Sequence, residues 1–379
     1  MNNIKQKQMY TFLIVLTVSC TIGLFTWRTL FNNFAVETAG LSGEHVGMIQ
    51  SVREIPGFLA FLLVFILLII KEHRLAALSI ILLGIGVAVT GLFPTYWGLL
   101  ITTFAMSFGF HYYQTISQSL TLQYFDKTTS PWILGRLRSF ASLSNIVAGI
   151  LIYLLAFVMG YVEIYLVMGG LILIAGIWGY IQDPSDFGIP PQRIKIVLRR
   201  KYWLFYFITF MGGARRQIFI VFAVLLLVEK FEYTIQAITV LFILNNIIGY
   251  FLNPLIGKAI IRFGERKVLS MEYFSLIIIF LAYAMVKSWV LPAVLYILDH
   301  VFFSFSMAIQ TYFQKIGDTE DIAPSMAAGT TINHIAAVVI PAICGIMWMV
   351  DYRLPFVIGA GMSLVSLIIV QLIHVPEQS

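Results

Sequence analysis

Twelve apolar runs of helix length dominate this chain. A helix that crosses a bilayer needs about 20 mostly apolar residues, whereas an outer-membrane barrel is built from shorter, alternating strands. We therefore expect an all-α, polytopic membrane protein. The predicted spans cover residues 9–36, 45–70, 74–93, 97–124, 132–158, 163–181, 203–228, 234–257, 268–287, 290–314, 325–350 and 354–373.

The composition agrees with this class of protein. Of 379 residues, 60% are hydrophobic and 11% are charged, and the mean hydropathy is +0.91. No soluble domain buries that much apolar surface. Lys5 and Lys7 precede the first run without a small-residue cleavage site, which predicts a retained first helix. Cys20 and Cys344 lie within runs, so we expect them to pack there and to form neither a disulfide nor a metal site.

Two short motifs recur at a single offset. Residues 28–36 and 216–224 both read R-x-x-F-x-x-F-A-V, and Tyr124-Phe-Asp-Lys is matched by Tyr312-Phe-Gln-Lys, again 188 residues later. A shared offset indicates a duplicated chain. We predict two six-helix bundles, residues 1–181 and 203–379, joined by a cytoplasmic linker at 182–202.

The distribution of basic residues predicts the orientation. Of the 24 Lys and Arg residues, three fall in outer loops and four lie within spans if the N-terminus is cytoplasmic, so all the others lie on the cytoplasmic side. Cytoplasmic loops carry such an excess. We expect a multi-pass protein of the cell (inner) membrane with both termini in the cytoplasm.

Residues 257–267, read as the loop between spans eight and nine, have the sequence G-K-A-I-I-R-F-G-E-R-K. This resembles the G-x-x-x-D-R-x-G-x-R-R loop of the major facilitator superfamily, although Ile261 stands where the family usually has aspartate. The equivalent first-half loop is reduced to Lys71-Glu-His-Arg. The resemblance implies the major facilitator fold, a transport function, and a gating role for Arg262, Gly264 and Arg266. Helix carbonyls or an acid such as Glu272 are candidate partners of the two arginines.

An arginine pair is the strongest candidate for the substrate site. Arg28 and Arg216 occupy equivalent places in spans one and seven, roughly 12–18 Å from a span end at about 1.5 Å per residue. The family resemblance implies a central cavity across which they face each other. A guanidinium offers a planar fork for phosphate or carboxylate. The pair resembles that of the organophosphate:phosphate antiporters, which hold an anion between arginines of these two helices.

One alternative is that each arginine forms a structural ion pair with a buried acid, Glu54 or Asp299, and another is that the pair couples to gating. Arg215 points about 100° away from Arg216 on a helix, so it can pair elsewhere. Span four adds a polar face at helical spacing, formed by His111, Gln114, Thr115 and Gln118. The predicted substrate-binding residues are Arg28, Arg53, Arg216, Tyr112, Gln114, Gln118 and Asn246.

A second set of residues at the same depth is titratable. Carboxylates and imidazoles inside a membrane are common proton carriers in transporters. The alternatives are structural roles, an ion pair with an arginine for Asp299 and hydrogen-bonded packing for His334. The predicted proton-coupling residues are Asp299, His300, Glu54, His111 and His334.

No catalytic constellation accompanies these residues. The chain has no Walker lysine loop, no G-x-S-x-G, no H-E-x-x-H and no metal-ligand spacing, so we expect no enzyme, cofactor or metal site. We predict a secondary active transporter of a small, anionic solute, coupled to protons or to a counter-anion. The alternatives are a proton-driven exporter of amphipathic compounds, of the drug or siderophore type, and a membrane enzyme or sensor. We expect a monomer whose partners are the solute, the coupling ion and the bilayer, with no nucleic acid.

Overall fold

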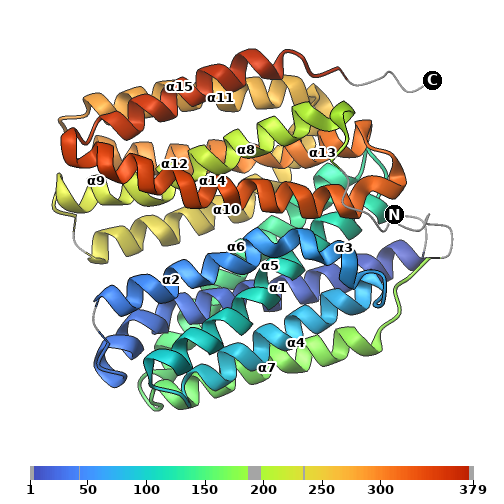
Figure 1. The fold of residues 1–379 in the computed structure, drawn as a ribbon, viewed down its shortest axis with the longest axis vertical. Helices are drawn as coiled ribbons and strands as arrows, with labels where there is room; N and C mark the ends of the chain where they lie inside the picture. The colour runs from blue at the N-terminus through green and yellow to red at the C-terminus, as the bar shows by residue number, and fades with distance from the viewer. Residues whose placement is uncertain (1–3, 42, 187–197, 234, 375–379) are drawn as a thin grey trace. The chain divides into compact units, whose positions relative to one another are not determined.

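The computed structural model describes residues 4–41, 43–186, 198–233 and 235–374, and within these ranges every regular element is a helix (Figure 1). The chain forms two compact units. The N-unit comprises Met1–Phe125, Phe140–Val197 and Thr319–Thr331. The C-unit comprises Asp126–Ser139, Leu198–Asp318 and Ile332–Ser379.

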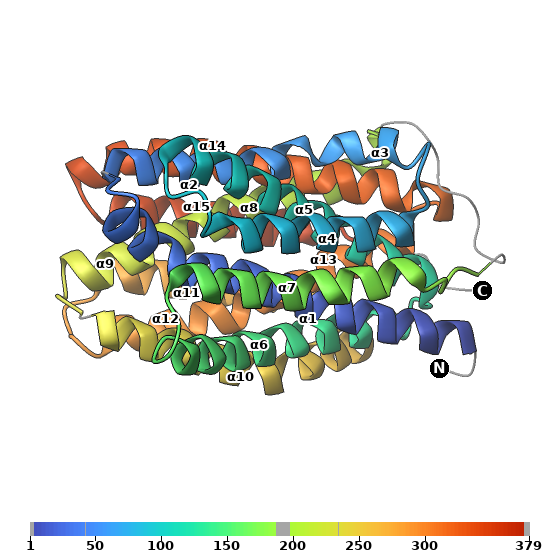
Figure 2. The ribbon, with the colours of Figure 1, turned by 90° about the horizontal axis from the view of Figure 1, so that it is seen from below.

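The first half of the chain supplies most of the N-unit. Its helices are α1 (Ile4–Asn33), the π-helix η1 (Phe34–Thr38), α2 (Gly43–Phe58), the 3₁₀-helix η2 (Leu59–Leu62), α3 (Leu63–Ile66), α4 (Glu72–Thr90), α5 (Tyr96–Tyr124), α6 (Ser130–Leu155) and α7 (Tyr161–Ile181). Helices α4 and α7 lie side by side (Figures 1 and 2). Glycine makes this closeness possible, because a Cβ on Gly169 would lie 2.4 Å from the backbone nitrogen of Ala88.

The second half supplies most of the C-unit. Its helices are η3 (Arg200–Tyr202), α8 (Trp203–Gln217), the π-helix η4 (Ile218–Ala223), α9 (Val224–Glu229), α10 (Ile235–Phe263), α11 (Glu265–Met285), α12 (Leu291–Phe303), the 3₁₀-helix η5 (Ser304–Ser306), α13 (Met307–Ile316), η6 (Thr319–Asp321), α14 (Ile322–Val350) and α15 (Leu354–Val370). An apolar core joins η4, α9, α10, α11, α12, α14 and α15, with the rings of Tyr283 and Phe356 stacked 5.0 Å apart.

The helices confirm the predicted fold class. Among the described residues, ten helical stretches are long and apolar enough to cross a membrane, and α15 is a shorter apolar helix. The remaining predicted span is α5, whose 29 residues suffice in length but include the polar face that lowers its hydropathy. Together these account for the twelve predicted spans.

Each half of the chain contributes one segment to the unit formed mainly by the other half. The start of α6, up to Ser139, belongs to the C-unit, and the start of α14, up to Thr331, belongs to the N-unit. The 188-residue offset maps 126–139 onto 314–327, so the exchanged segments are largely repeat equivalents. This reciprocity agrees with a duplicated chain. The linker at 182–202 stays a prediction, and its residues 187–197 lie outside the described residues.

The prediction that residues 257–267 form a loop is wrong. Residues 257–263 end α10, and α11 begins at Glu265, which leaves Gly264 as the only non-helical residue between them. Gly264 has φ +79°, a left-handed conformation that L side chains rarely adopt, and its N–H donates to the Ile260 carbonyl (2.9 Å). Glu72, His73 and Arg74 are likewise helical, at the start of α4.

Candidate functional site

The repeated arginine motif coincides with a π-helix in both units. In the N-unit, η1 overlaps the end of the motif, and in the C-unit η4 lies inside it. A π-helical turn inside an α-helix is uncommon and is frequent at functional sites. The duplicated motif therefore marks a local irregularity in both halves of the chain, at the segment that carries Arg28 or Arg216.

In the N-unit, Arg53 and Glu54 form an ion pair while their side chains remain 21% and 28% exposed. The Arg53 guanidinium lies 5.7 Å from the ring centre of Trp27, which is buried on α1. Ser107 on α5 donates a hydrogen bond to the Arg53 carbonyl. These contacts hold the pair against α1 and α5, and Arg28 lies one residue beyond Trp27 with its side chain exposed.

The polar face of α5 divides into two parts. His111 is buried, and Thr115 is hydrogen-bonded to Thr330 of the same unit (2.9 Å). The Tyr112 hydroxyl, which we predicted to bind substrate, donates to the Leu59 carbonyl at the 3₁₀ turn of the second span (3.3 Å). Gln114 is exposed and Gln118 is half-buried. Of the predicted face, the two glutamines are the accessible members.

The C-unit holds charges that are almost completely buried. Arg215 is 2% exposed, and Glu272 and Asp299 are each 1% exposed. Arg215 interacts electrostatically with both acids, donates a hydrogen bond to the Ser366 hydroxyl, and lies 4.3 Å from the ring centre of Tyr273. Arg215 thus pairs away from Arg216, as the helical geometry predicts.

Arg138 connects the start of α6 to the same charges. Its Nη1 donates to the Ser304 carbonyl (2.9 Å), at the 3₁₀ turn that separates α12 from α13. It also interacts electrostatically with Glu272 and with His300. We call these residues the buried charge cluster, which consists of Arg138, Arg215, Glu272, Asp299 and His300.

The other predicted C-unit residues lie outside this cluster. Arg216 is half-buried, as is Asn246, whose amide donates to the Phe242 carbonyl within its own helix (2.9 Å). His334 is buried on α14, where the neighbouring Asn333 amide reaches the Thr209 carbonyl (3.4 Å). Arg28 and Arg216 belong to different units, so their face-to-face placement stays a prediction, as does that of His111 relative to Asp299.

The predicted gating residues surround the turn at Gly264. Arg262 and Arg266 are exposed, and the Arg262 guanidinium lies 5.3 Å from the ring centre of Phe263. Glu272, a candidate partner for these arginines, interacts with Arg138 and Arg215 instead. The acid with an ion pair at this end of α11 is Glu265, which binds Lys315 (2.8 Å).

Sequence reasoning missed Glu272, Arg138 and Ser366 as members of one site. Glu272 lies three and four residues from Leu269 and Leu276, so it shares the buried face of α11. The sequence signal for Glu272 is therefore a charge on the apolar face of a span. Arg138 falls among the positive charges predicted to be cytoplasmic, and Ser366, a single serine in an apolar helix, gives no comparable signal.

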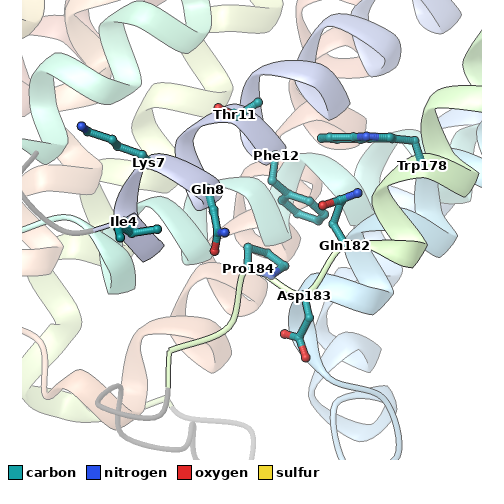
Figure 3. A pocket seen from close by; sticks show the side chains of 9 residues that line it. All are labelled: Ile4, Lys7, Gln8, Thr11, Phe12, Trp178, Gln182, Asp183 and Pro184. Carbon is teal, nitrogen blue, oxygen red and sulfur yellow. The ribbon is translucent and has the colours of Figure 1, made fainter.

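A groove of about 310 Å³ lies apart from all these residues, between the start of α1 and the end of α7. Figure 3 shows the side chains that line it, which include Lys7, Trp178 and Asp183. Ser185 donates its hydroxyl to the Asp183 carboxylate and holds the pKa of this acid below its ordinary value. No predicted site residue lines the groove.

The fold is shared with solved structures of transporters. The E. coli fucose:proton symporter FucP has a TM-score of 0.76 at 12% identity, with 98% of each chain covered. The human organic anion transporter MFSD10 has 0.75 at 12%, covering 97% of this chain and 99% of its own. A bacterial homologue of the iron transporter ferroportin, in an outward-facing state, has 0.77 at 12%, covering 96% and 98%. Identities this low show the fold alone.

A search of curated proteins found no match to this chain. A family model does match: that of the Major Facilitator Superfamily, over residues 9–341. This range covers most of the chain, including the repeated arginine motif and the turn at Gly264. The chain therefore belongs to the Major Facilitator Superfamily, and it is a multi-pass membrane protein and a secondary transporter rather than an enzyme.

Proposed function

We propose that this transporter moves a small anionic solute across the cell (inner) membrane by alternating access, coupled to protons, with both termini in the cytoplasm. The observation that carries the proposal is that three predicted substrate-binding arginines are accessible, whereas two acids of the C-unit are buried. Arg28 is exposed, and Arg53 and Arg216 are half-buried, whereas Asp299 and Glu272 are completely buried.

Arginine side chains are too costly to face lipid in the middle of a span. The accessible arginines therefore indicate water-filled surface within the membrane segment of each unit. In the N-unit this surface carries the guanidinium groups of Arg28 and Arg53, the second of which pairs with Glu54. Such a surface favours an anion, and a guanidinium fork matches the geometry of a carboxylate or phosphate.

The other predicted residues take roles consistent with their accessibility. Gln114, Gln118 and Asn246 offer neutral hydrogen bonds to the solute. Asp299 and His300 carry the coupling proton, and Arg262, Gly264 and Arg266 act at the turn between α10 and α11 during gating. The same fold accommodates related cargo in other proteins, since MFSD10 is an organic anion transporter and FucP a fucose:proton symporter.

Uptake into proteoliposomes tests this proposal. Purified protein is screened by thermal shift against phosphorylated, carboxylated and cationic solutes, and any stabilising solute is then used as radiolabelled cargo with an imposed pH gradient. Arg28→Lys and Arg216→Lys keep the charge but lose the bidentate fork, so each should impair transport of an anion.

The outer-loop substitution Arg353→Lys is the matched control and should transport normally. Stabilisation by cations alone, or normal transport by both lysine variants, would contradict an anion site. Transport of the solute without dependence on the pH gradient, but with dependence on an anion on the far side, would replace proton coupling with counter-anion exchange.

A further inference from the structure

The two acids of the buried charge cluster do not have the partners that a buried carboxylate needs. Asp299 Oδ2 and Glu272 Oε2 are inaccessible, and neither atom has a hydrogen-bond partner among the described residues. An ionised carboxylate in that position is costly unless it is paired and hydrogen-bonded. Glu272 shares this situation with Asp299, although only Asp299 was expected to bind a proton.

The nearby cation is held by other groups. Arg215 donates to the Ser366 hydroxyl, which in turn donates to the Met362 carbonyl (2.8 Å). On its other side the guanidinium lies 4.3 Å from the ring centre of Tyr273. A guanidinium has five N–H donors, and the buried Nε and Nη2 of Arg215 have no hydrogen-bond partner among the described residues. Donors are therefore left for a carboxylate.

The groups that face the two acids limit the possible charge states. Arg138 and Arg215 both stay charged, because a guanidinium is not deprotonated in proteins. Proton exchange in the cluster is therefore left to the acids and to neighbouring imidazole and phenol groups. The charged or titratable groups that interact with Glu272 or Asp299 are Arg138, Arg215, Tyr273 and Tyr283. His300 interacts with Arg138, and Tyr296 with Tyr283, so both lie one contact further from the acids.

We propose that Glu272 and Asp299 form one proton-binding pair, and that Arg215 is the positioning residue that controls it by moving between Ser366 and the two carboxylates. While Ser366 and Tyr273 hold Arg215, the pair keeps a proton. When Arg215 turns to the pair, the O–H bond breaks, the proton leaves to water, and the carboxylate keeps the electron pair and binds the guanidinium. This inference rests on the proposed proton coupling and adds Glu272 to it.

The position of Arg215 in its helix links this movement to the substrate residue. Arg216 is the next residue of α8, and the π-helix η4 begins two residues later at Ile218. A change of register in that π-helical turn would rotate both arginines together. A solute that binds Arg216 would in this way change which partner Arg215 holds, and with it the proton.

Infrared difference spectroscopy on the full chain in lipid nanodiscs tests the pair without requiring transport. The carboxyl C=O stretching band, identified by its shift in D₂O, is titrated with pH. We expect Glu272→Gln and Asp299→Asn each to change the amplitude or the midpoint of the titrating band, and the double variant to remove it. Glu163→Gln, at an exposed acid, is the control and should change nothing.

Two further variants test the role of Arg215. Ser366→Ala releases Arg215 to the acids and should move the titration to lower pH, by about one unit, while Arg215→Gln should move it to higher pH by about one to three units. A band unaffected by Glu272→Gln, or a Ser366→Ala variant that titrates like the parent, would overturn the proposal. A band that behaves as expected in a protein without pH-driven transport would overturn the proposed function alone.

Discussion

The two units treat their membrane-depth charges in opposite ways. The N-unit pairs sequence neighbours, Arg53 and Glu54, and leaves both about a quarter exposed. The C-unit collects Arg215, Glu272 and Asp299 from three different helices and buries them to 2% or less. A partly accessible pair can exchange partners with a solute. A buried cluster can respond only through a proton or a movement of its own side chains.

The repeat sharpens this difference. The 188-residue offset that maps Arg28 onto Arg216 also maps His111 onto Asp299. The duplicated halves have therefore kept their arginines and diverged in the titratable residue on the fourth helix of each half. This divergence suggests a division of labour, in which the N-unit contributes accessible positive charge and the C-unit contributes proton exchange.

The largest expected effect is on stability, from removal of the cation in each unit. Arg215→Gln removes a buried cation that interacts with two buried acids and should destabilise the protein by roughly 3–5 kcal/mol. Arg53→Gln breaks a partly solvated pair, so it should cost about 1 kcal/mol or less. Thermal unfolding followed by size-exclusion chromatography compares the two, and equal effects would remove the distinction between the units.

The second effect concerns energy coupling. Asp299→Asn should abolish accumulation driven by a pH gradient and leave substrate binding, or exchange without a gradient, largely intact, because the neutral amide cannot cycle a proton. His111→Asn is the repeat-equivalent control in the N-unit and should keep gradient-driven accumulation. Proteoliposome uptake with and without a pH gradient distinguishes the cases. Loss of coupling only in the histidine variant would move the proton site to the N-unit.

The third effect is on stability, and it compares a glycine required for close helix packing, Gly169, with a glycine required for a turn, Gly264. Gly169→Ala should destabilise the N-unit by about 1–3 kcal/mol, since its Cβ would meet the Ala88 backbone at 2.4 Å. Gly264→Ala places a side chain at φ +79° and should cost about 1–2 kcal/mol in the C-unit. Gly170 has no atom within 4 Å of an added Cβ, so Gly170→Ala is the control, and its Tm should not fall.

The fold could be predicted from the sequence because its determinants are local. The apolar runs determine the spans, and the helical stretches of the described residues begin and end near the predicted edges of these spans. The length of the turn at Gly264 could not be predicted. A motif of glycine and charged residues predicts a loop in the same way for a turn of one residue and for a loop of eleven. Only the backbone conformation shows that Gly264 alone leaves the helix.

The sequence could predict which helices carry the candidate site residues, but not their partners. Counting along spans predicts Asp299, Arg215 and Arg53 at membrane depth, and all three lie within helices. It could not show that Glu54 pairs with its own neighbour, or that Arg215 turns to Ser366 of α15, because such pairs depend on which helix faces which. Glu272 is predicted as a partner of Arg262 and Arg266, whereas in the structure it is buried on α11, which packs against α12 and α15.

The smallest expected effect lies just after α7, at Ser185 of the N-unit. Ser185→Ala removes the hydroxyl that lowers the pKa of Asp183, and should cost about 0.5 kcal/mol or less because this carboxylate is mostly solvated. An acid whose folded pKa lies below its unfolded value, about 3.9, stabilises the protein above that pH and loses the contribution as the pH falls through the folded pKa. The difference in Tm between variant and parent should therefore be constant from about pH 5 to 8 and disappear as the pH falls through the folded pKa of Asp183. A difference that instead changes near neutral pH would implicate His73, whose imidazole lies 3.6 Å from Asp183.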